Sequence, residues 1–221
     1  MTRLLGEEAL ERSPVVANCT MNRERSLTGS NGYGRELGLD IAAELAAAPG
    51  GAPARWLDLC CGTGRALHEA AALLGGAVEI VGVDLAGHFV PAAAPPGLTL
   101  VEASVTTWAP EGRFDLVTSV HGLHYVGDKL GVLARAASWL TGDGLLMASF
   151  DARSVRLAGG RRVAAELRRQ GFAYDARRKR ISMRGGREVC FPYRYLGADD
   201  TAGPNYTGQP AVDSFYEDRR T

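Results

Sequence analysis

The sequence predicts an α/β domain built on a doubly wound, mostly parallel sheet between two layers of helices. Apolar runs of strand length alternate with helical patterns along most of the chain, which is typical of parallel strands joined by helices. A glycine-rich turn joins the first strand-like run to the helical pattern that follows it. The chain of 221 residues has no internal repeat and no low-complexity linker, so one domain accounts for its core.

The elements follow from their hydrophobic periods. The first helix is expected over residues 35–47, with Ile41 and Leu45 on its apolar face. Strands are then expected at residues 55–60, 78–83, 98–102, 114–120 and 144–150. The other helices are expected at residues 64–74, 128–140 and 160–170. Two extended stretches, 172–183 and 187–196, are joined by Arg-Gly-Gly and predict an antiparallel hairpin.

The composition is that of a soluble globular protein, with 46% apolar and 23% charged residues. A formal net charge of zero gives no overall attraction to nucleic acid or to a membrane surface. The polar, acidic start does not resemble a signal peptide, and no apolar run reaches the length of a membrane span. Cys60 and Cys61 are adjacent in an apolar run, which argues against a disulfide framework. We therefore expect a cytoplasmic protein without a membrane partner.

The turn in LDLCCGTGRAL indicates the kind of ligand. Gly62 and Gly64 let the backbone turn sharply and approach a ligand at the positive end of a helix. A dinucleotide fold needs a third glycine where this chain has Leu67, so the turn does not fit a pyrophosphate. Asp58 would repel a pyrophosphate but suits a ligand that bears an amino group and a sulfonium. Asp84 ends the next strand, where a carboxylate accepts hydrogen bonds from the hydroxyls of a ribose.

Four segments in order, LDLCCGTGRAL, VGVDL, FDLVTSVHGLHYV and GDGLLMASF, resemble those of class I S-adenosylmethionine-dependent methyltransferases. The resemblance spans residues 35–197. It implies a seven-stranded sheet whose last hairpin reverses one strand. It also implies an enzyme that transfers a methyl group and uses S-adenosylmethionine as its cofactor.

The resemblance further implies which residues meet the cofactor. The two glycines of the turn would lie against its homocysteine part, with Asp58 near its amino group, and Asp84 would bind its ribose. Ser104 stands where the family often has an acidic or amide partner for the adenine amine, so recognition would rest partly on Val105 and on backbone groups. The cofactor-binding candidates of the core are therefore Asp58, Cys60, Gly62, Thr63, Gly64, Asp84, Leu85, Ser104, Val105 and Ser119.

Two histidines follow the fourth predicted strand, at the edge where a parallel sheet binds its ligands. Methyl transfer gains much from positioning alone, but a hydroxyl or an acidic carbon must also lose a proton. Imidazole titrates near neutral pH, so His121 and His124 are the candidate catalytic bases, with His121 ahead. The structural alternative is that one of them caps the helix near Asp128 and the other packs under the cofactor. A zinc site is not expected, because no C-x-x-C accompanies the H-x-x-H.

The segments that flank the domain are expected to lie over the site. Residues 1–34 form an N-terminal arm, and in related enzymes a segment before the first core helix often closes above the cofactor. Tyr33 and Arg35 are candidates to bind the carboxylate of the cofactor, since a guanidinium binds carboxylates in a bidentate fork. The C-terminal tail, residues 198–221, is expected to pack on the domain. A solvated arm and a tail that wraps the surface are the alternatives.

Residues 153–187 carry eleven arginines and one lysine against few acids. This charge could attract RNA or a phosphorylated substrate, although its spread over a helix and a hairpin is also typical of a solvated face. The chain lacks the D/N-P-P-Y/F motif and the catalytic cysteine pairs that several nucleic-acid methylating families use, and it has only two lysines.

The sequence therefore predicts a methyltransferase whose acceptor is a small molecule of specialised metabolism, methylated on oxygen, nitrogen or carbon. The alternative within the class is an RNA methyltransferase guided by residues 153–187. The alternatives from other classes are a protein that binds S-adenosylmethionine without methylating and, more distantly, a dinucleotide oxidoreductase.

Overall fold

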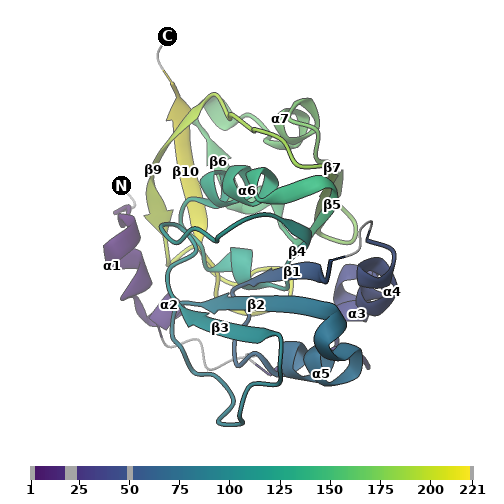
Figure 1. The fold of residues 1–221 in the computed structure, drawn as a ribbon. Helices are drawn as coiled ribbons and strands as arrows, with labels where there is room; N and C mark the ends of the chain where they lie inside the picture. The colour runs from purple at the N-terminus through teal and green to yellow at the C-terminus, as the bar shows by residue number, and fades with distance from the viewer. Residues whose placement is uncertain (1–2, 18–23, 49–51, 220–221) are drawn as a thin grey trace.

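The computed structural model describes residues 3–17, 24–48 and 52–219, and it contains a seven-stranded sheet between two layers of helices (Figure 1). In spatial order the strands are β3 (Leu98–Glu102), β2 (Val78–Asp84), β1 (Ala54–Leu59), β4 (Phe114–Ser119), β5 (Leu140–Ser149), β8 (Arg180–Arg184) and β7 (Ala173–Asp175). The strands from β3 to β5 are parallel, and β8 is antiparallel to both of its neighbours. The predicted fold class is confirmed.

Each face of the sheet is covered by its own helices. One layer holds α3 (Tyr33–Leu37), α4 (Ile41–Ala46) and α5 (Arg65–Leu74), and the other holds α6 (Lys129–Ser138) and α7 (Ala164–Arg169). Trp56 and Leu116 belong to the core of the first layer, whereas their chain neighbours Leu57 and Val117 belong to the core of the second. Successive side chains of a strand point to opposite faces, so a strand buried on both faces is apolar at most positions.

The single helix predicted over residues 35–47 is wrong, because the chain forms the two short helices α3 and α4 there. α3 ends at Gly38, whose φ of 67° suits a glycine, and the Asp40 side chain caps α4 by accepting a backbone hydrogen bond of 3.1 Å. The Arg180 guanidinium donates to two carbonyls of α3 at 2.6 and 2.7 Å. These hydrogen bonds satisfy carbonyls at the end of the helix and so reinforce it. A Cβ at Gly38 would collide with the guanidinium, which also favours glycine there.

The hairpin predicted between residues 172–183 and 187–196 is also wrong. The antiparallel hairpin is formed by β7 and β8, which both begin inside the first of these stretches, and β8 extends one residue beyond it. Asp175 makes its turn by accepting hydrogen bonds from two following backbone N–H groups, both at 2.9 Å. Gly185 and Gly186 instead donate to backbone carbonyls at the start of β5, both at 2.8 Å, so the chain leaves the sheet there.

The second stretch contributes to a separate three-stranded sheet, in the order β6 (Val155–Leu157), β10 (Asp213–Asp218) and β9 (Tyr193–Asp199). The N-terminal helices α1 (Glu7–Glu11) and α2 (Pro14–Ala17) lie beside it, and Leu5 pairs with Ala198 of β9 (Figure 1). The buried Lys129 Nζ joins α6 to the tail by donating to the Val212 carbonyl at 2.7 Å and to Ser214 Oγ at 2.9 Å. Arm and tail are therefore attached to the same side of the domain.

Other boundaries differ little from those expected. α7 begins at Ala164 and not at residue 160, because Gly159 and Gly160 adopt positive φ angles of 74° and 69° before it. The short 3₁₀ helices are η1 (Gly75–Ala77), η2 (Gly122–His124), η3 (Ala152–Ser154) and η4 (Ala158–Gly160). The division of the chain into arm, domain and tail stays a prediction.

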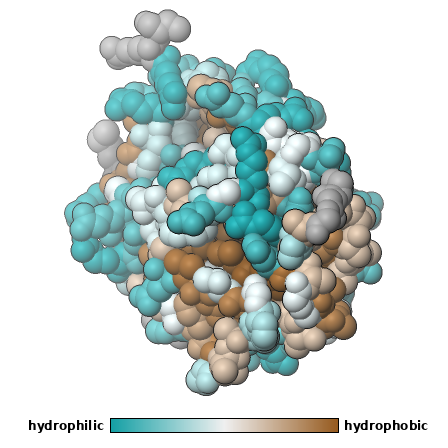
Figure 2. All heavy atoms as spheres, in the orientation of Figure 1, coloured by the Kyte–Doolittle hydropathy of each residue, from teal (hydrophilic) through white to brown (hydrophobic). Residues whose placement is uncertain are grey.

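The surface is uneven in character. On the face drawn in Figure 2, apolar side chains gather in the lower half, over β2, β3 and the loop between them, whereas hydrophilic side chains cover most of the upper half. Among the helices of the described residues, none has both the length and the apolar character that crossing a membrane requires.

Candidate active site

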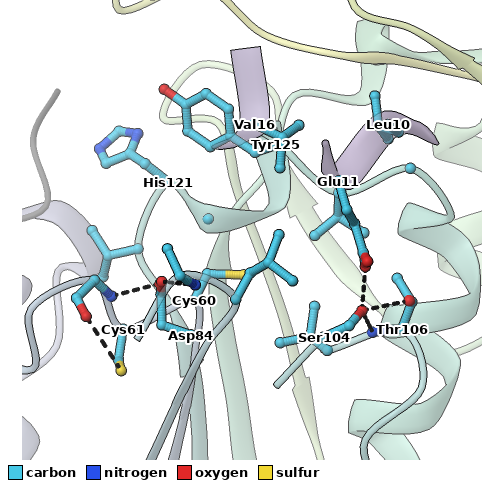
Figure 3. Close-up of a pocket in the computed structure, with 18 of the residues that line it drawn as sticks. Leu10, Glu11, Val16, Cys60, Cys61, Asp84, Ser104, Thr106, His121 and Tyr125 are labelled. Atoms are coloured by element: carbon cyan, nitrogen blue, oxygen red, sulfur yellow. Dashed lines mark hydrogen bonds between the residues drawn. The ribbon is translucent and has the colours of Figure 1, made fainter. Parts of the chain in front are cut away.

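A pocket lies at the carboxyl ends of β1, β2, β3 and β4, where open parallel sheets bind their ligands (Figure 3). The residues at these strand ends that line it are 60–62, 84–86, 104–106 and 120–122. The rest of the wall consists of 125–127, the arm residues Glu7, Leu10, Glu11, Val16, Arg25 and Tyr33, and the tail residues Asn205, Thr207 and Gln209. Segments far apart in the sequence thus meet around one cavity.

The turn after β1 brings the backbone to the pocket. Gly62 lines the pocket with a φ of 62°, and Cys60 lines it with a φ of 58°, which is uncommon for a residue with a side chain. Gly64 begins α5 with a φ of 73°, and a Cβ there would lie 3.0 Å from the Leu100 side chain. Of the four predicted residues of this turn, Cys60 and Gly62 line the pocket, whereas Thr63 and Gly64 do not.

Asp84, at the end of β2, faces the pocket with a carboxylate that backbone groups hold in place (Figure 3). Its Oδ2 accepts a hydrogen bond from the Gly62 N–H at 2.9 Å, and its Oδ1 accepts one from the Ala86 N–H at 3.1 Å. A carboxylate oxygen has a second lone pair, so both oxygens retain capacity for a ligand's hydroxyl groups. The predicted neighbour Leu85 also lines the pocket.

Asp58 lies behind the pocket wall and not in it. The residue is fully buried, and its carboxyl accepts hydrogen bonds from the Tyr33 hydroxyl at 2.7 Å and from Thr118 Oγ1 at 2.5 Å. Burial raises the pKa of Asp58 to about 7, against the lowering effect of both hydroxyl donors. Tyr33 lines the pocket in its place, so Asp58 reaches the cavity only through the tyrosine that it holds.

The arm contributes an acidic group that sequence reasoning missed. Figure 3 shows Glu11 of α1 directed at Ser104, and the Ser104 hydroxyl donates a hydrogen bond to the Glu11 carboxylate. The Thr106 N–H donates to Ser104 Oγ at 3.2 Å, and the predicted residue Val105 between them is buried and also lines the pocket. No sequence motif marks Glu11, because it lies 93 residues from its partner.

His121 follows β4 and lines the pocket with a ring that a carboxylate holds. Its Nε2 lies 3.0 Å from Glu36 Oε2, and the other oxygen of Glu36 accepts a hydrogen bond of 3.3 Å from Arg25. The hydrogen bond with His121 is the main cause that lowers the pKa of Glu36, and the charge of Arg25 adds to it. His121 Nδ1 is buried without a hydrogen-bond partner in the part of the chain that the structure describes.

Of the two arginines near the start of α3, Arg25 lines the pocket and the predicted Arg35 does not. The Arg25 side chain is buried, lines the pocket and donates to Asn31 Oδ1 at 2.7 Å. Arg35 does not line the pocket, and its guanidinium donates to the Ser30 carbonyl at 3.1 Å on the surface. The arginine that reaches the pocket comes from the arm and precedes α3, so helical spacing could not have identified it.

His124 is buried beside His121, with 5.5 Å between the ring centroids, but it lines a neighbouring cavity and not the pocket. Burial lowers the pKa of His124 to about 3, so its imidazole is neutral near neutral pH. Ser119 is also buried and lines neither cavity. The helix-capping alternative is wrong for both histidines, because the Asp128 side chain caps α6 by accepting a hydrogen bond from Gly131 N–H at 2.9 Å.

Solved structures similar to this chain include methyltransferases, each matched over part of its length. One is CalS10 of Micromonospora echinaspora, an amino pentose methyltransferase involved in calicheamicin biosynthesis, at 25% identity and a TM-score of 0.39 over 52% of each chain. Another is phosphoethanolamine N-methyltransferase 2 of Haemonchus contortus, at 19% identity and a TM-score of 0.44 over 64% of this chain and 34% of that one. The matches thus cover about half of the first protein and about a third of the second.

The family is shown by the comparison with protein-family models. The model of a methyltransferase domain matches residues 33–190, which is more than half of the chain. No curated protein matches the chain significantly. The matched range contains the turn after β1, Asp84 and both histidines, and the chain therefore belongs to the family of class I methyltransferase domains.

Proposed function

We propose that the pocket holds S-adenosylmethionine and that His121 removes a proton from a small-molecule acceptor while the acceptor is methylated. The observation that carries this proposal is the contact between His121 and Glu36 at the pocket wall. A carboxylate that fixes one ring nitrogen orients a histidine so that the other nitrogen can act as a base.

The charge of Glu36 determines which nitrogen of His121 carries the proton. Because the pKa of Glu36 is lowered, this carboxylate is ionised near neutral pH and can only accept hydrogen bonds. Nε2 is then the donor, and the neutral ring keeps its lone pair on Nδ1. Nδ1 has no partner among the described residues, so it can accept the proton of an acceptor bound within hydrogen-bond reach.

The residues of the pocket suit the cofactor in charge and shape. Bound S-adenosylmethionine supplies a methyl group on a positively charged sulfur, which leaves as a neutral thioether when the lone pair of the acceptor attacks the methyl carbon. Asp84 would accept hydrogen bonds from the ribose hydroxyls, since it lines the pocket and each of its oxygens keeps a lone pair beyond its one backbone contact. Cys60 and Gly62 would lie against the homocysteine part, and Leu85, Ser104 and Val105 would surround the adenine.

The carboxylate of the cofactor would be bound by Arg25, which replaces Arg35 in this proposal. Arg25 is buried at the pocket wall near Tyr33, and a guanidinium has N–H groups in excess of the two contacts that it makes with Asn31 and Glu36. Asp58 would act through Tyr33, whereas Thr63, Gly64 and Ser119 would support the turns from behind the pocket wall.

A small acceptor is favoured over RNA by two observations. Residues of the arm and of the tail form part of the pocket wall, which restricts the entry of a polymer. In addition, six of the eleven arginines in residues 153–187 form salt bridges with acids of this chain, so much of the charge is neutralised locally. That the acceptor belongs to specialised metabolism stays a prediction.

The test uses S-adenosylmethionine labelled in its methyl group. The protein is incubated with this compound and with either the small-molecule fraction or the RNA fraction of a bacterial extract. Label that enters small molecules, together with formation of S-adenosylhomocysteine, supports the proposal. Label that enters RNA alone contradicts the choice of a small acceptor. A Glu36→Gln variant should transfer label more slowly, because an amide in that position can also donate to Nε2 and stabilise the wrong tautomer.

A further inference from the structure

A second cavity adjoins the pocket, and the mechanism above makes no use of it. Its wall begins where β5 ends, at the same carboxyl edge of the sheet, and continues along the turn before β8 and the tail. It is lined by His124, 151–157, 160–164, Tyr174, Ala176, Lys179, 202–205, Ala211 and Asp213. The position matters because ligands of open α/β sheets bind along this edge.

The two cavities are separated by a small group of rings. His121 lines the pocket, His124 lines the second cavity, and the Tyr206 ring packs against both, at centroid distances of 6.1 and 5.3 Å. Asn205 of the tail lines both cavities. The two cavities therefore adjoin at Asn205, and a molecule held in the second cavity lies close to the rings that contact the candidate base.

The wall of the second cavity carries more positive than negative charge. Its cationic side chains are Arg153, Arg156, Arg161, Arg162 and Lys179, and its acids are Asp151 and Asp213. Five cations face two acids on the wall, and Arg161 is also paired with Asp218 outside it at 2.5 Å, so an excess of about two positive charges remains.

The acids hold some of these cations in place and leave donors free. Buried Asp151 contacts Arg153 at 3.1 Å and Lys179 at 3.2 Å. Of the three guanidinium nitrogens of Arg156, Nε alone contacts Asp213, at 2.6 Å. The Nη groups of Arg156 make no hydrogen bond within the described residues, and Arg162 makes no salt bridge with any of them. Guanidinium groups in this state match the geometry of an oxyanion.

The wall of the second cavity also contains a buried polar atom that has no hydrogen-bond partner among the described residues. His124 Nε2 is buried and makes no hydrogen bond with the described residues, although His124 lines the cavity. A buried polar atom without a partner costs free energy unless a ligand or water satisfies it. Arginines at one part of the wall and this unpaired nitrogen at another are suited to a molecule with an anionic end and a polar end.

We propose that the second cavity binds the methyl acceptor and that the acceptor is a small molecule with an oxyanion group, either a carboxylate or a phosphate. Arg156 and Arg162 would bind the oxyanion, and His124 would contact the polar part that points to the pocket. This inference rests on the proposed function, because it takes the first pocket to hold the cofactor.

Isothermal titration of the purified protein with three probes of similar size tests the proposal. The probes are phenyl phosphate, benzoate and neutral benzamide, each added in the presence of saturating S-adenosylhomocysteine. At least one of the two anions should bind and benzamide should not, and the stronger anion identifies the oxyanion. Arg156→Gln and Arg162→Gln should each weaken that binding about three- to tenfold, the range of one charged hydrogen bond at a partly exposed site. The matched control is Arg168→Gln, which changes an exposed arginine of α7 that lines neither cavity and should leave binding unchanged.

Separate outcomes distinguish this inference from the proposed function. If S-adenosylhomocysteine does not bind the wild type, the proposed function fails. If it binds but neither anion does, or benzamide binds equally well, the second cavity is not an oxyanion site. An equal loss in the Arg168→Gln and Arg162→Gln variants would also overturn the inference, because the charge would then act without a defined site. So would tighter binding of a short single-stranded RNA than of both anions, which would indicate a nucleic-acid surface.

Discussion

The pocket and the second cavity share one edge of the sheet but are built in different ways. The core of the pocket consists of turns directly after β1, β2, β3 and β4, where glycines and one carboxylate are fixed by backbone geometry. The second cavity consists of the segment after β5, the turn before β8 and the tail, and its charges are placed by ion pairs between side chains. Turns of the first kind need particular residue types at fixed spacing, so they can be recognised as motifs in the sequence. Ion pairs between distant side chains have no fixed spacing, so the sequence shows only a region rich in arginine.

The same difference applies to Asp58 and His124, two of the buried titratable groups near these cavities. Asp58 stands behind the pocket between two hydroxyl donors that support its charge, whereas His124 stands at the second cavity with an unpaired Nε2. The residue behind the pocket thus belongs to a completed network, and the residue at the second cavity belongs to a network that is open to a ligand.

The largest effect is expected at His121, whose ring packs with those of His124 and Tyr206 between the two cavities. His121→Ala should lower kcat by roughly 10²- to 10⁴-fold, the usual contribution of a positioned base, and leave the affinity for S-adenosylhomocysteine nearly unchanged. Steady-state kinetics and titration calorimetry measure the two effects separately. His88→Ala is the matched control, because His88 is exposed and lines neither cavity. If only His124→Ala shows the kinetic loss, the base belongs to the second cavity, and if neither does, the acceptor needs no base.

A smaller effect is expected on cofactor binding when Asp84 is replaced. Asp84→Ala should weaken S-adenosylhomocysteine binding by about 1–3 kcal/mol, because it leaves the ribose hydroxyls without a charged acceptor. Asp84→Asn should lose less, since the amide oxygen can still accept one hydrogen bond. Asp143→Ala, at an exposed site of β5, should bind as the wild type does. Unchanged affinity in both Asp84 variants would remove the ribose assignment.

The next prediction compares Asp58 with His124 through the pH dependence of stability. Asp58 has a pKa raised from 3.8 to about 7, so its contribution to stability is present at low pH and is lost as pH rises towards 7. His124 has a pKa lowered from 6.5 to about 3, so its contribution is present above pH 6.5 and is lost as pH falls towards 3. Between pH 4 and pH 7 the two effects oppose each other in the wild type.

Removing either group should therefore reveal the pH dependence of stability that the other group contributes. In Asp58→Asn the free energy of unfolding should rise more steeply with pH than in the wild type, and in His124→Asn less steeply, with differences of about 2 kcal/mol across this range. Urea unfolding at pH 4.5, 5.5 and 6.5 gives the slopes, whatever each variant loses in absolute stability. Equal slopes in all three proteins would mean that neither group titrates differently in the folded state.

The elements and motifs that rest on local chemistry were predictable. The parallel strands, α5, α6 and the place of Gly62 and Asp84 at the pocket follow from hydrophobic period and from a turn that small residues allow. The errors arose where tertiary contacts decide. Arg180 reinforces the break at Gly38, and the carboxylate of Asp175 fixes a turn earlier than the Arg-Gly-Gly segment.

The same limit applies to the candidate site. Tyr33 was identified, but its partner Asp58 could not be placed behind it from spacing, because the hydrogen bond joins residues 25 positions apart. Arg25 and Glu36 were missed because neither the arm nor the short helix α3 has a residue pattern that would direct them to His121. Contacts of the arm and the tail depend on how they fold back on the sheet, and one sequence carries little information about that.

The smallest effect is expected at Glu11, where the arm meets the pocket. Its carboxylate accepts a hydrogen bond from Ser104 and lines the part of the pocket assigned above to the adenine. Since a carboxylate only accepts hydrogen bonds, it favours an amino group over a carbonyl on the ligand. Glu11→Gln should therefore weaken S-adenosylhomocysteine binding about three- to fivefold, a loss of about 1 kcal/mol, but leave binding of the 6-oxo analogue S-inosylhomocysteine equal or stronger.

This change in preference is what distinguishes recognition by Glu11 from mere support of the arm. Titration calorimetry with both compounds measures it, and Glu8→Gln on the exposed side of the same helix serves as the control. An equal loss for both compounds would mean that Glu11 only holds α1 against Ser104. The arm would then cover the pocket without contributing to its specificity. Ligand recognition by side chains that tertiary contacts place would be expected at the second cavity alone.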